Sequence, residues 1–175
     1  NVSLFEKNDS IVSGPPICHL HAGGNLYREI SDDSCITLLK ESIDLLKLYP
    51  NAIDYRPTVL AIPKEDKGNP EDIYDRLNLL KKEYENLIQY DSSNKVLCSS
   101  QEYFKIYDKE TVLNLKNRDI VKNPSNFDEW MIPVSKNVDI DKLKFPLIMV
   151  QEYGLNIFRL SASASLMMEN IENID

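Results

Sequence analysis

Several residue types are scarce in this chain of 175 residues, which holds two histidines, one tryptophan, three cysteines and five glycines. The cysteines, Cys18, Cys35 and Cys98, have unrelated spacings, which fits a reducing compartment better than a disulfide framework. There is no run of about 18 apolar residues, so no transmembrane helix is predicted. The first residues lack the long apolar centre of a signal peptide, and we therefore expect a cytoplasmic protein.

Positive charge is also scarce and is never clustered. The formal net charge is -8 and the isoelectric point is about 4.8. Because nucleic acids and anionic membranes attract positively charged surfaces, we expect this chain to bind neither. Hydrophobic residues make up 42% of the chain, which is enough for an ordinary packed core.

The order of predicted elements is typical of an α/β or α+β chain. Strands are predicted at residues 2–6, 55–64, 102–108 and 144–154, and helices at 33–49, 71–90, 108–115 and 156–174. Residues 118–137 are expected to be rich in loops, since they contain Pro124 and Pro133. We expect a mixed or antiparallel sheet with helices packed on one face.

Helix boundaries and inner faces follow from caps and apolar periodicity. Asp32 or Asp33 is the expected N-cap of the first helix, and Asp108 that of the short third helix. The expected inner face of the last helix comprises Ile157, Leu160, Ala164, Met167, Met168 and Ile171.

The rare residues gather in one stretch, "GPPICHLHAGGNLYRE", from Gly14 to Glu29. A metal site is not expected, because the cysteine and histidines are too closely spaced for ordinary zinc geometry and no further histidine exists. On a strand Cys18 and His19 would point to opposite faces, which argues against a Cys–His catalytic pair. Paired glycines let a backbone approach a flat ligand, or simply form a turn beside a structural histidine.

The stretch "VSLFEK" before it predicts a strand that ends in Glu6, with Lys7 beside it. In dinucleotide-binding folds an acidic residue at the end of the second strand accepts hydrogen bonds from the ribose. An edge strand that ends in a surface charge would have the same sequence.

Together, "LFEK", a loop of Ser, Gly and Pro, and "LHAGGNLY" resemble the start of FAD-dependent oxidoreductases of the D-amino-acid oxidase superfamily. The resemblance is closest to the glycerol-3-phosphate dehydrogenase, glycine oxidase and malate:quinone oxidoreductase branches. It implies that Glu6 holds the ribose of FAD and that Lys7 is also among the cofactor-binding residues. It also implies that a loop approaches the flavin through Ser13, Gly14, His21, Ala22, Gly23 and Gly24.

The resemblance implies an internal fragment of a two-domain flavoprotein. Residues 1–30 would be a remnant of the FAD-binding domain, 31–155 a substrate-binding domain, and 156–175 a helix returning toward the FAD domain. The G-x-G-x-x-G turn and the closing half of the cofactor domain are not in this sequence, so we expect the fragment alone to bind FAD poorly and to be inactive.

The implied reaction is oxidation of a small 2-hydroxy or 2-amino acid, with malate as the preferred substrate and quinone as an acceptor. Candidate catalytic or carboxylate-binding residues are His21, Arg159 and Arg56, with Tyr55 beside the last. Arg159 could equally be a surface charge on its helix. Quinone-reducing relatives lie on a membrane surface, so the resemblance allows a peripheral position on the inner face of the membrane.

A second hypothesis comes from a different class of protein. The charged outer face of the 71–90 helix, and the lack of a complete catalytic set, are also typical of a non-catalytic acidic α/β module that binds a partner.

Overall fold

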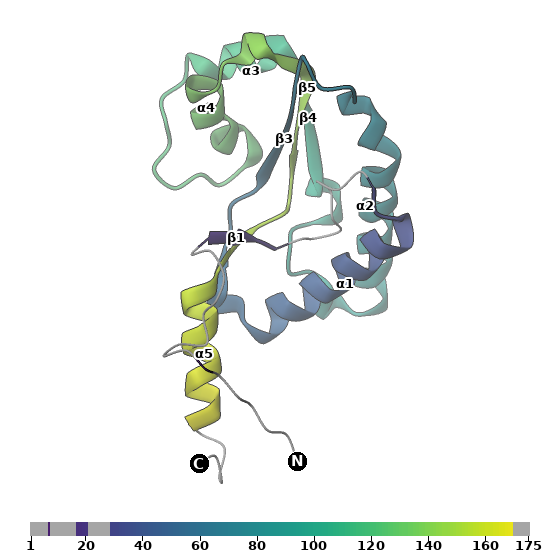
Figure 1. The fold of residues 1–175 in the computed structure, drawn as a ribbon, viewed down its shortest axis with the longest axis vertical. Coiled ribbons are helices and arrows are strands. Elements are labelled where there is room, and N and C mark those ends of the chain that lie inside the picture. Colours follow the sequence, from purple (N-terminus) through teal and green to yellow (C-terminus); the bar gives the residue numbers. More distant parts are fainter. Residues whose placement is uncertain (1–6, 8–16, 21–28, 170–175) are drawn as a thin grey trace.

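The computed structural model describes residue 7, residues 17–20 and residues 29–169 (Figure 1). These residues form an α+β fold, which confirms the expected class. The helices are α1 (Asp32–Leu48), α2 (Tyr74–Tyr90), α3 (Lys109–Lys116), α4 (Phe127–Asn137) and α5 (Ile157–Glu169). The strands are β1 (Ile17–His19), β2 (Ile53–Asp54), β3 (Thr58–Pro63), β4 (Phe104–Tyr107), β5 (Leu143–Val150) and β6 (Gly154–Asn156).

The strands form two antiparallel sheets, where we had expected one sheet. The smaller has the order β1-β6-β2 and the larger the order β3-β5-β4. The run expected as one strand ending at Gly154 is in fact β5 and β6, and residues 151–153 cross between the two sheets. This crossing is held by backbone bonds from Gln151 N to the carbonyl of Tyr103 (3.0 Å) and from Leu20 N to that of Tyr153 (2.8 Å).

The larger sheet is covered on both faces, so the expectation of helices on one face is wrong. Successive side chains of β5 point to opposite sides. Leu147 and Met149 pack in the cluster formed with α3 and α4, whereas Ile148 and Val150 pack against Leu77 of α2. A central strand that is apolar at every position from 147 to 150 requires cover on both sides, which is why these four residues are buried.

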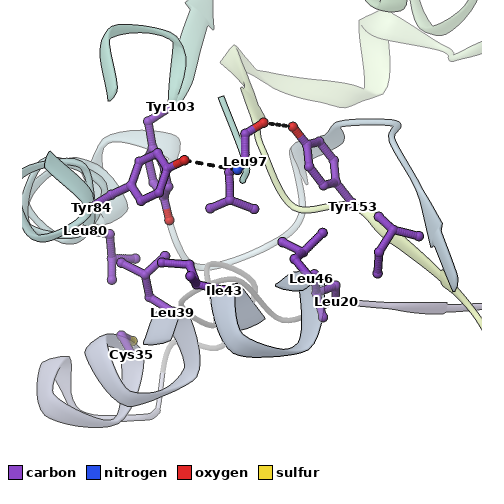
Figure 2. Packing of buried hydrophobic residues seen from close by; sticks show 11 residues of the cluster. Leu20, Cys35, Leu39, Ile43, Leu46, Leu80, Tyr84, Leu97, Tyr103 and Tyr153 are labelled. Atoms are coloured by element: carbon purple, nitrogen blue, oxygen red, sulfur yellow. Dashed lines mark hydrogen bonds between the residues drawn. The ribbon is translucent and has the colours of Figure 1, made fainter. Parts of the chain in front are cut away.

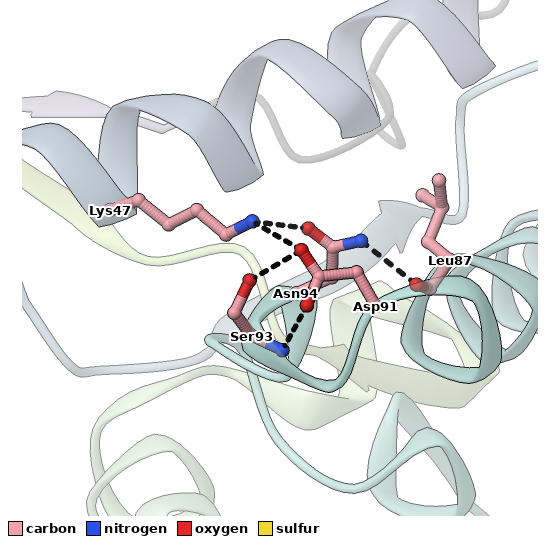
Figure 3. A network of polar contacts seen from close by, with 5 residues as sticks. All are labelled: Lys47, Leu87, Asp91, Ser93 and Asn94. Carbon is pink, nitrogen blue, oxygen red and sulfur yellow. Dashed lines mark hydrogen bonds and ion pairs between the residues drawn. The ribbon is translucent and has the colours of Figure 1, made fainter.

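The main core lies between α1 and α2 (Figure 2). Leu39, Ile43 and Leu46 of α1 are buried as their spacing predicts, and so are Leu80 and Tyr84 of α2. A polar network joins the ends of the same two helices (Figure 3). In it Lys47 contacts the side chains of Asn94 and Asp91, and Asn94 donates to the carbonyl of Leu87 at 2.8 Å.

The N-caps of α1 and α3 were both predicted from the sequence, and only that of α3 is correct. Asp108 caps α3 as predicted, because its carboxylate accepts from Thr111 N at 2.7 Å. The N-cap of α1 is Ser31, whose hydroxyl accepts from Ser34 N at 3.2 Å, so the choice of Asp32 or Asp33 was wrong. Both acids lie in the first turn instead, where the helix dipole favours negative charge.

Helix α4 occupies part of the region expected to be loop. Its start is capped by Asn126, whose side chain accepts from Glu129 N at 3.0 Å, while the Glu129 carboxylate accepts from Ser125 N at 2.7 Å. Pro133 lies inside the helix, which is why reading proline as a helix breaker failed here. The Asn-x-x-Glu spacing was the signal that could have predicted this helix.

Helix α5 extends away from the rest of the fold (Figure 1). None of its described residues is fully buried. Of the expected inner face, Ile157, Leu160, Ala164 and Met168 are half-buried and Met167 is exposed, while Ile171 lies outside the described residues. Phe158, Leu166 and Met167 are 58%, 59% and 55% exposed. Across the described part of the chain, no helix combines the length and the apolar character needed to cross a membrane.

The contribution of Tyr84 to the stability of the core can be tested. Its hydroxyl donates to the carbonyl of Cys98 (3.0 Å). The hydroxyl also accepts from Leu97 N (3.0 Å), as Figure 2 shows. Tyr84→Phe leaves these groups without the hydroxyl, so we expect the free energy of unfolding to fall by about 2 kcal/mol in urea titrations. Tyr90→Phe is the control, since Tyr90 is 91% exposed and lies in the same helix. Equal effects of the two variants would contradict this role.

Candidate functional site

Two regions contain the candidate functional residues. The first, which we call the neck, is the small sheet β1-β6-β2 with the start of α5. Here Arg159 forms an ion pair with Asp54 of β2, through Nη2 and Oδ1. The two side chains are 44% and 42% exposed, so the pair lies at the surface. Arg159, a predicted binder of the substrate carboxylate, therefore already has a carboxylate partner in this chain.

Arg56 also belongs to the neck. Its guanidinium lies against the backbone of Gly154, where a Cβ atom would be only 2.8 Å from Arg56 Nη2. The glycine therefore leaves room for the arginine to cover β6. The structure thus brings Arg56 and Arg159 to the same small sheet, although they are far apart in the sequence.

A buried acid at the neck was missed by the sequence analysis. Glu152 is 0% exposed, and its backbone carbonyl accepts a hydrogen bond from the Thr58 hydroxyl at 2.7 Å. Glutamate is seldom fully buried unless it is paired. Its position between two apolar strand segments was the available signal.

Most of the predicted FAD contacts lie outside the described residues, namely Glu6, Ser13, Gly14, His21, Ala22, Gly23 and Gly24. Lys7 is described and is exposed. Their roles in FAD binding therefore remain predictions.

The second region is a cleft of about 540 Å³ beside the crossing between the two sheets. Pro57, Lys105 and Gln151 belong to the larger sheet or its ends, and residues 124–130 contribute the start of α4. The opposite side contains Cys98, Gln101 and Glu102. Aromatic side chains line much of the cleft: Tyr55, Phe104, Phe127, Trp130 and Tyr153.

A three-residue cluster lies at the α4 side of the cleft. Asp128 Oδ1 accepts from Lys105 Nζ at 2.6 Å and from the Tyr107 hydroxyl at 2.7 Å. Burial pushes the pKa of Asp128 upward, but these hydrogen bonds outweigh burial and hold the pKa below its ordinary value. Burial and the neighbouring Asp128 raise the pKa of Tyr107. The cluster thus pairs an ionised Asp128 with the side chain of Lys105 and with a neutral tyrosine.

The other side of the cleft is negatively charged. Glu102 accepts from the Ser99 hydroxyl at 2.7 Å. Burial, with the Glu102 charge as a further contribution, raises the pKa of the Cys98 thiol to about 12. Burial, followed by the neighbouring Cys98, Tyr84 and Tyr55, raises the pKa of Tyr153. Cys98 is therefore a protonated thiol rather than a reactive thiolate.

Tyr153 and Tyr84 hold in place the segment that forms the Cys98 side of the cleft. Tyr153 donates to the carbonyl of Leu97, and its ring meets that of Tyr55 edge-on with centroids 5.2 Å apart. Tyr84 holds the same segment from the core side through Leu97 and Cys98. The wall of the cleft is thus tied to the folded core.

The cleft was not predicted from the sequence. Its lining comes from four separated segments, and no short motif marks them. Tyr55 and Tyr153, which both line it, are far apart in the sequence, and only the pairing of the strands places their rings together.

Comparisons with protein-family models, curated proteins and solved structures found no match to this chain.

The Asp128 cluster predicts a pH-dependent contribution to stability. A carboxylate whose pKa is lowered by folding stabilises the protein above its unfolded-state pKa, and this contribution is lost as the pH falls through the folded-state value. We expect Asp128→Asn to lower the free energy of unfolding by about 1 kcal/mol near neutral pH, a modest value because the pair with Lys105 is partly exposed.

The difference in the free energy of unfolding between Asp128→Asn and the original protein should shrink as the pH falls below 3.8, the ordinary pKa of the group. Urea titrations at several pH values measure it. Asp119→Asn, at an exposed position, is the control. A difference that stays constant down to the lowest pH would contradict this role of Asp128.

Proposed function

We propose that this chain is the substrate-binding part of an FAD-dependent oxidoreductase that acts on a small 2-hydroxy or 2-amino acid. In this proposal residues 1–30 belong to the FAD-binding domain, 31–155 to the substrate domain, and 156–175 lead back to the FAD domain. The observation that carries the proposal is the pairing of β1 with β6.

β1 and β6 lie side by side and antiparallel, with Cys18 opposite Leu155 and His19 opposite Gly154. The chain therefore comes into the fold and leaves it at one place. A domain inserted between two halves of another domain needs this arrangement, because its two ends must connect to a single body. β1 is preceded by the segment that resembles a ribose-binding strand, and β6 leads directly into α5.

Exposed apolar side chains of α5 support the same proposal. Phe158, Leu166 and Met167 are each more than half exposed, on more than one side of the helix, and such apolar surface is commonly covered by a contacting domain. In the family that the sequence resembles, the helix at this position returns to the FAD domain. We propose that this domain is what covers α5.

The flavin would accept the hydride in such an enzyme, while the protein binds and orients the substrate. From this chain, Glu6 would hold the ribose, Lys7 would lie beside it in the cofactor site, and residues 21–24 would approach the flavin. Arg56 and Arg159 are the candidates for the substrate carboxylate. Arg159 would then exchange, or share, its contact with Asp54.

A non-catalytic binding module is the second candidate. It is favoured by the cleft, whose lining combines five aromatic side chains with a few polar groups.

Flavin content tests the leading proposal. We expect the product of the complete gene to purify yellow, or to gain flavin absorbance when FAD is added. Leu166→Glu should lower the amount of bound FAD severalfold, because it places a charge where α5 would contact the FAD domain. Leu113→Glu is the matched control, since Leu113 is also an exposed leucine of a helix, 42% exposed.

The two variants separate the parts of the proposal. A colourless product that takes up no FAD would overturn the assignment to flavoenzymes. Equal loss of FAD in both variants, with a yellow parent protein, would overturn only the role of α5.

A further inference from the structure

We propose that the cleft between α4 and the segment 98–102 binds a small organic cation, an ammonium group attached to an aromatic or apolar body. This inference goes beyond the proposed oxidoreductase and does not depend on FAD. It rests on the shape of the cleft, its aromatic lining and the balance of its charges.

The size of the cleft suits a small molecule. Its volume of about 540 Å³ lies within the range of ordinary ligand pockets. It also combines apolar rings with a few polar groups, as such pockets do. Its amide side chains, from Gln101, Asn126 and Gln151, could fix the orientation of a bound molecule.

The charges of the lining favour a cation. Among the described lining residues, the charged ones are Lys105, Glu102 and Asp128. Lys105 is already neutralised by Asp128 at 2.6 Å, so the charge of Glu102 is left in excess. Glu102 lines the cleft together with Cys98, and its carboxylate is held there by the Ser99 hydroxyl at 2.7 Å.

An anion would bind poorly in the same place. To reach Lys105 Nζ it would compete with Asp128, which also accepts from the buried hydroxyl of Tyr107. Removing the lysine would leave an ionised carboxylate with one hydrogen bond fewer, which is costly in a partly buried site. A carboxylic acid substrate of the proposed oxidoreductase therefore has no natural position here.

The aromatic lining complements the charge. Tyr and Trp rings attract cations through their electron-rich faces, and they also pack against apolar groups. Tyr55 is 55% exposed and stands beside Tyr153, so its ring is accessible to a ligand. Trp130, the one tryptophan of the sequence, lines the cleft as well.

Trp130 provides a direct measurement. Its fluorescence can be followed while three probes that share a phenyl ring are added to the 175-residue chain. Phenethylamine carries a cation, 2-phenylethanol is neutral, and phenylacetate is an anion. We expect phenethylamine to bind about tenfold more tightly than 2-phenylethanol, the size of effect that one charge-assisted hydrogen bond gives. Phenylacetate should bind most weakly.

Variants identify the groups responsible. Glu102→Gln keeps the acceptor for Ser99 but removes the charge, so phenethylamine should lose its advantage while 2-phenylethanol is unaffected. Glu110→Gln, an exposed acid in α3 that does not line the cleft, should change nothing. Tyr55→Leu should weaken all three probes, and phenethylamine most, because leucine offers no ring face to a cation.

Three results would overturn the proposal. They are equal binding of the three probes, tightest binding of phenylacetate, or no response of Trp130 up to the solubility limit of phenethylamine. A preference for phenethylamine that survives in Glu102→Gln would also count against it, because the charge would then come from elsewhere.

Discussion

The structure depends on β6, a strand of three residues that pairs on both sides. Leu155 lies opposite Cys18 of β1 and opposite Ile53 of β2, so one residue of β6 fixes the register of both neighbours. β6 follows β5 after only residues 151–153, and therefore it also fixes where the larger sheet ends. The pairing of β6 with β1 therefore holds the first strand, β1, beside the start of the last helix, α5.

The crossing from β5 to β6 connects the core to the cleft. Thr58 and Tyr103 hold its backbone, and Gln151 and Tyr153 of the same crossing line the cleft. Tyr153 then holds Leu97 from one side, while Tyr84 holds it from the other. A ligand in the cleft would thus touch groups positioned by the packing of α1 and α2, which favours a preformed site over one that forms on binding.

Local signals predicted local structure. The apolar spacing of Leu39, Ile43 and Leu46 predicted the inner face of α1, and Asp108 predicted the start of α3, because both depend on neighbours within a turn or two. Pro133 misled the prediction of α4, since a favourable cap and packing of Met131 and Ile132 outweigh the cost of a proline.

Contacts between distant segments could not be predicted in this way. The Asp54–Arg159 pair and the cleft depend on strand pairing over most of the chain, for which one sequence has no signal. The apolar spacing of α5 was recognised, but spacing does not say whether the covering surface lies in the same chain. In the proposed flavoenzyme, the FAD domain would cover the exposed side chains of α5. This arrangement requires that β1 and β6 lie side by side.

A disulfide test addresses that pairing most directly. Directly opposed residues of antiparallel strands have Cα atoms about 4.5–5.5 Å apart, within the range that a disulfide spans. In Leu155→Cys, mild oxidation should therefore join the new thiol to Cys18, as read by peptide mapping, and Cys18→Ser should abolish the product. Failure to form this bond, while both thiols still react with an alkylating reagent, would contradict the side-by-side arrangement of β1 and β6.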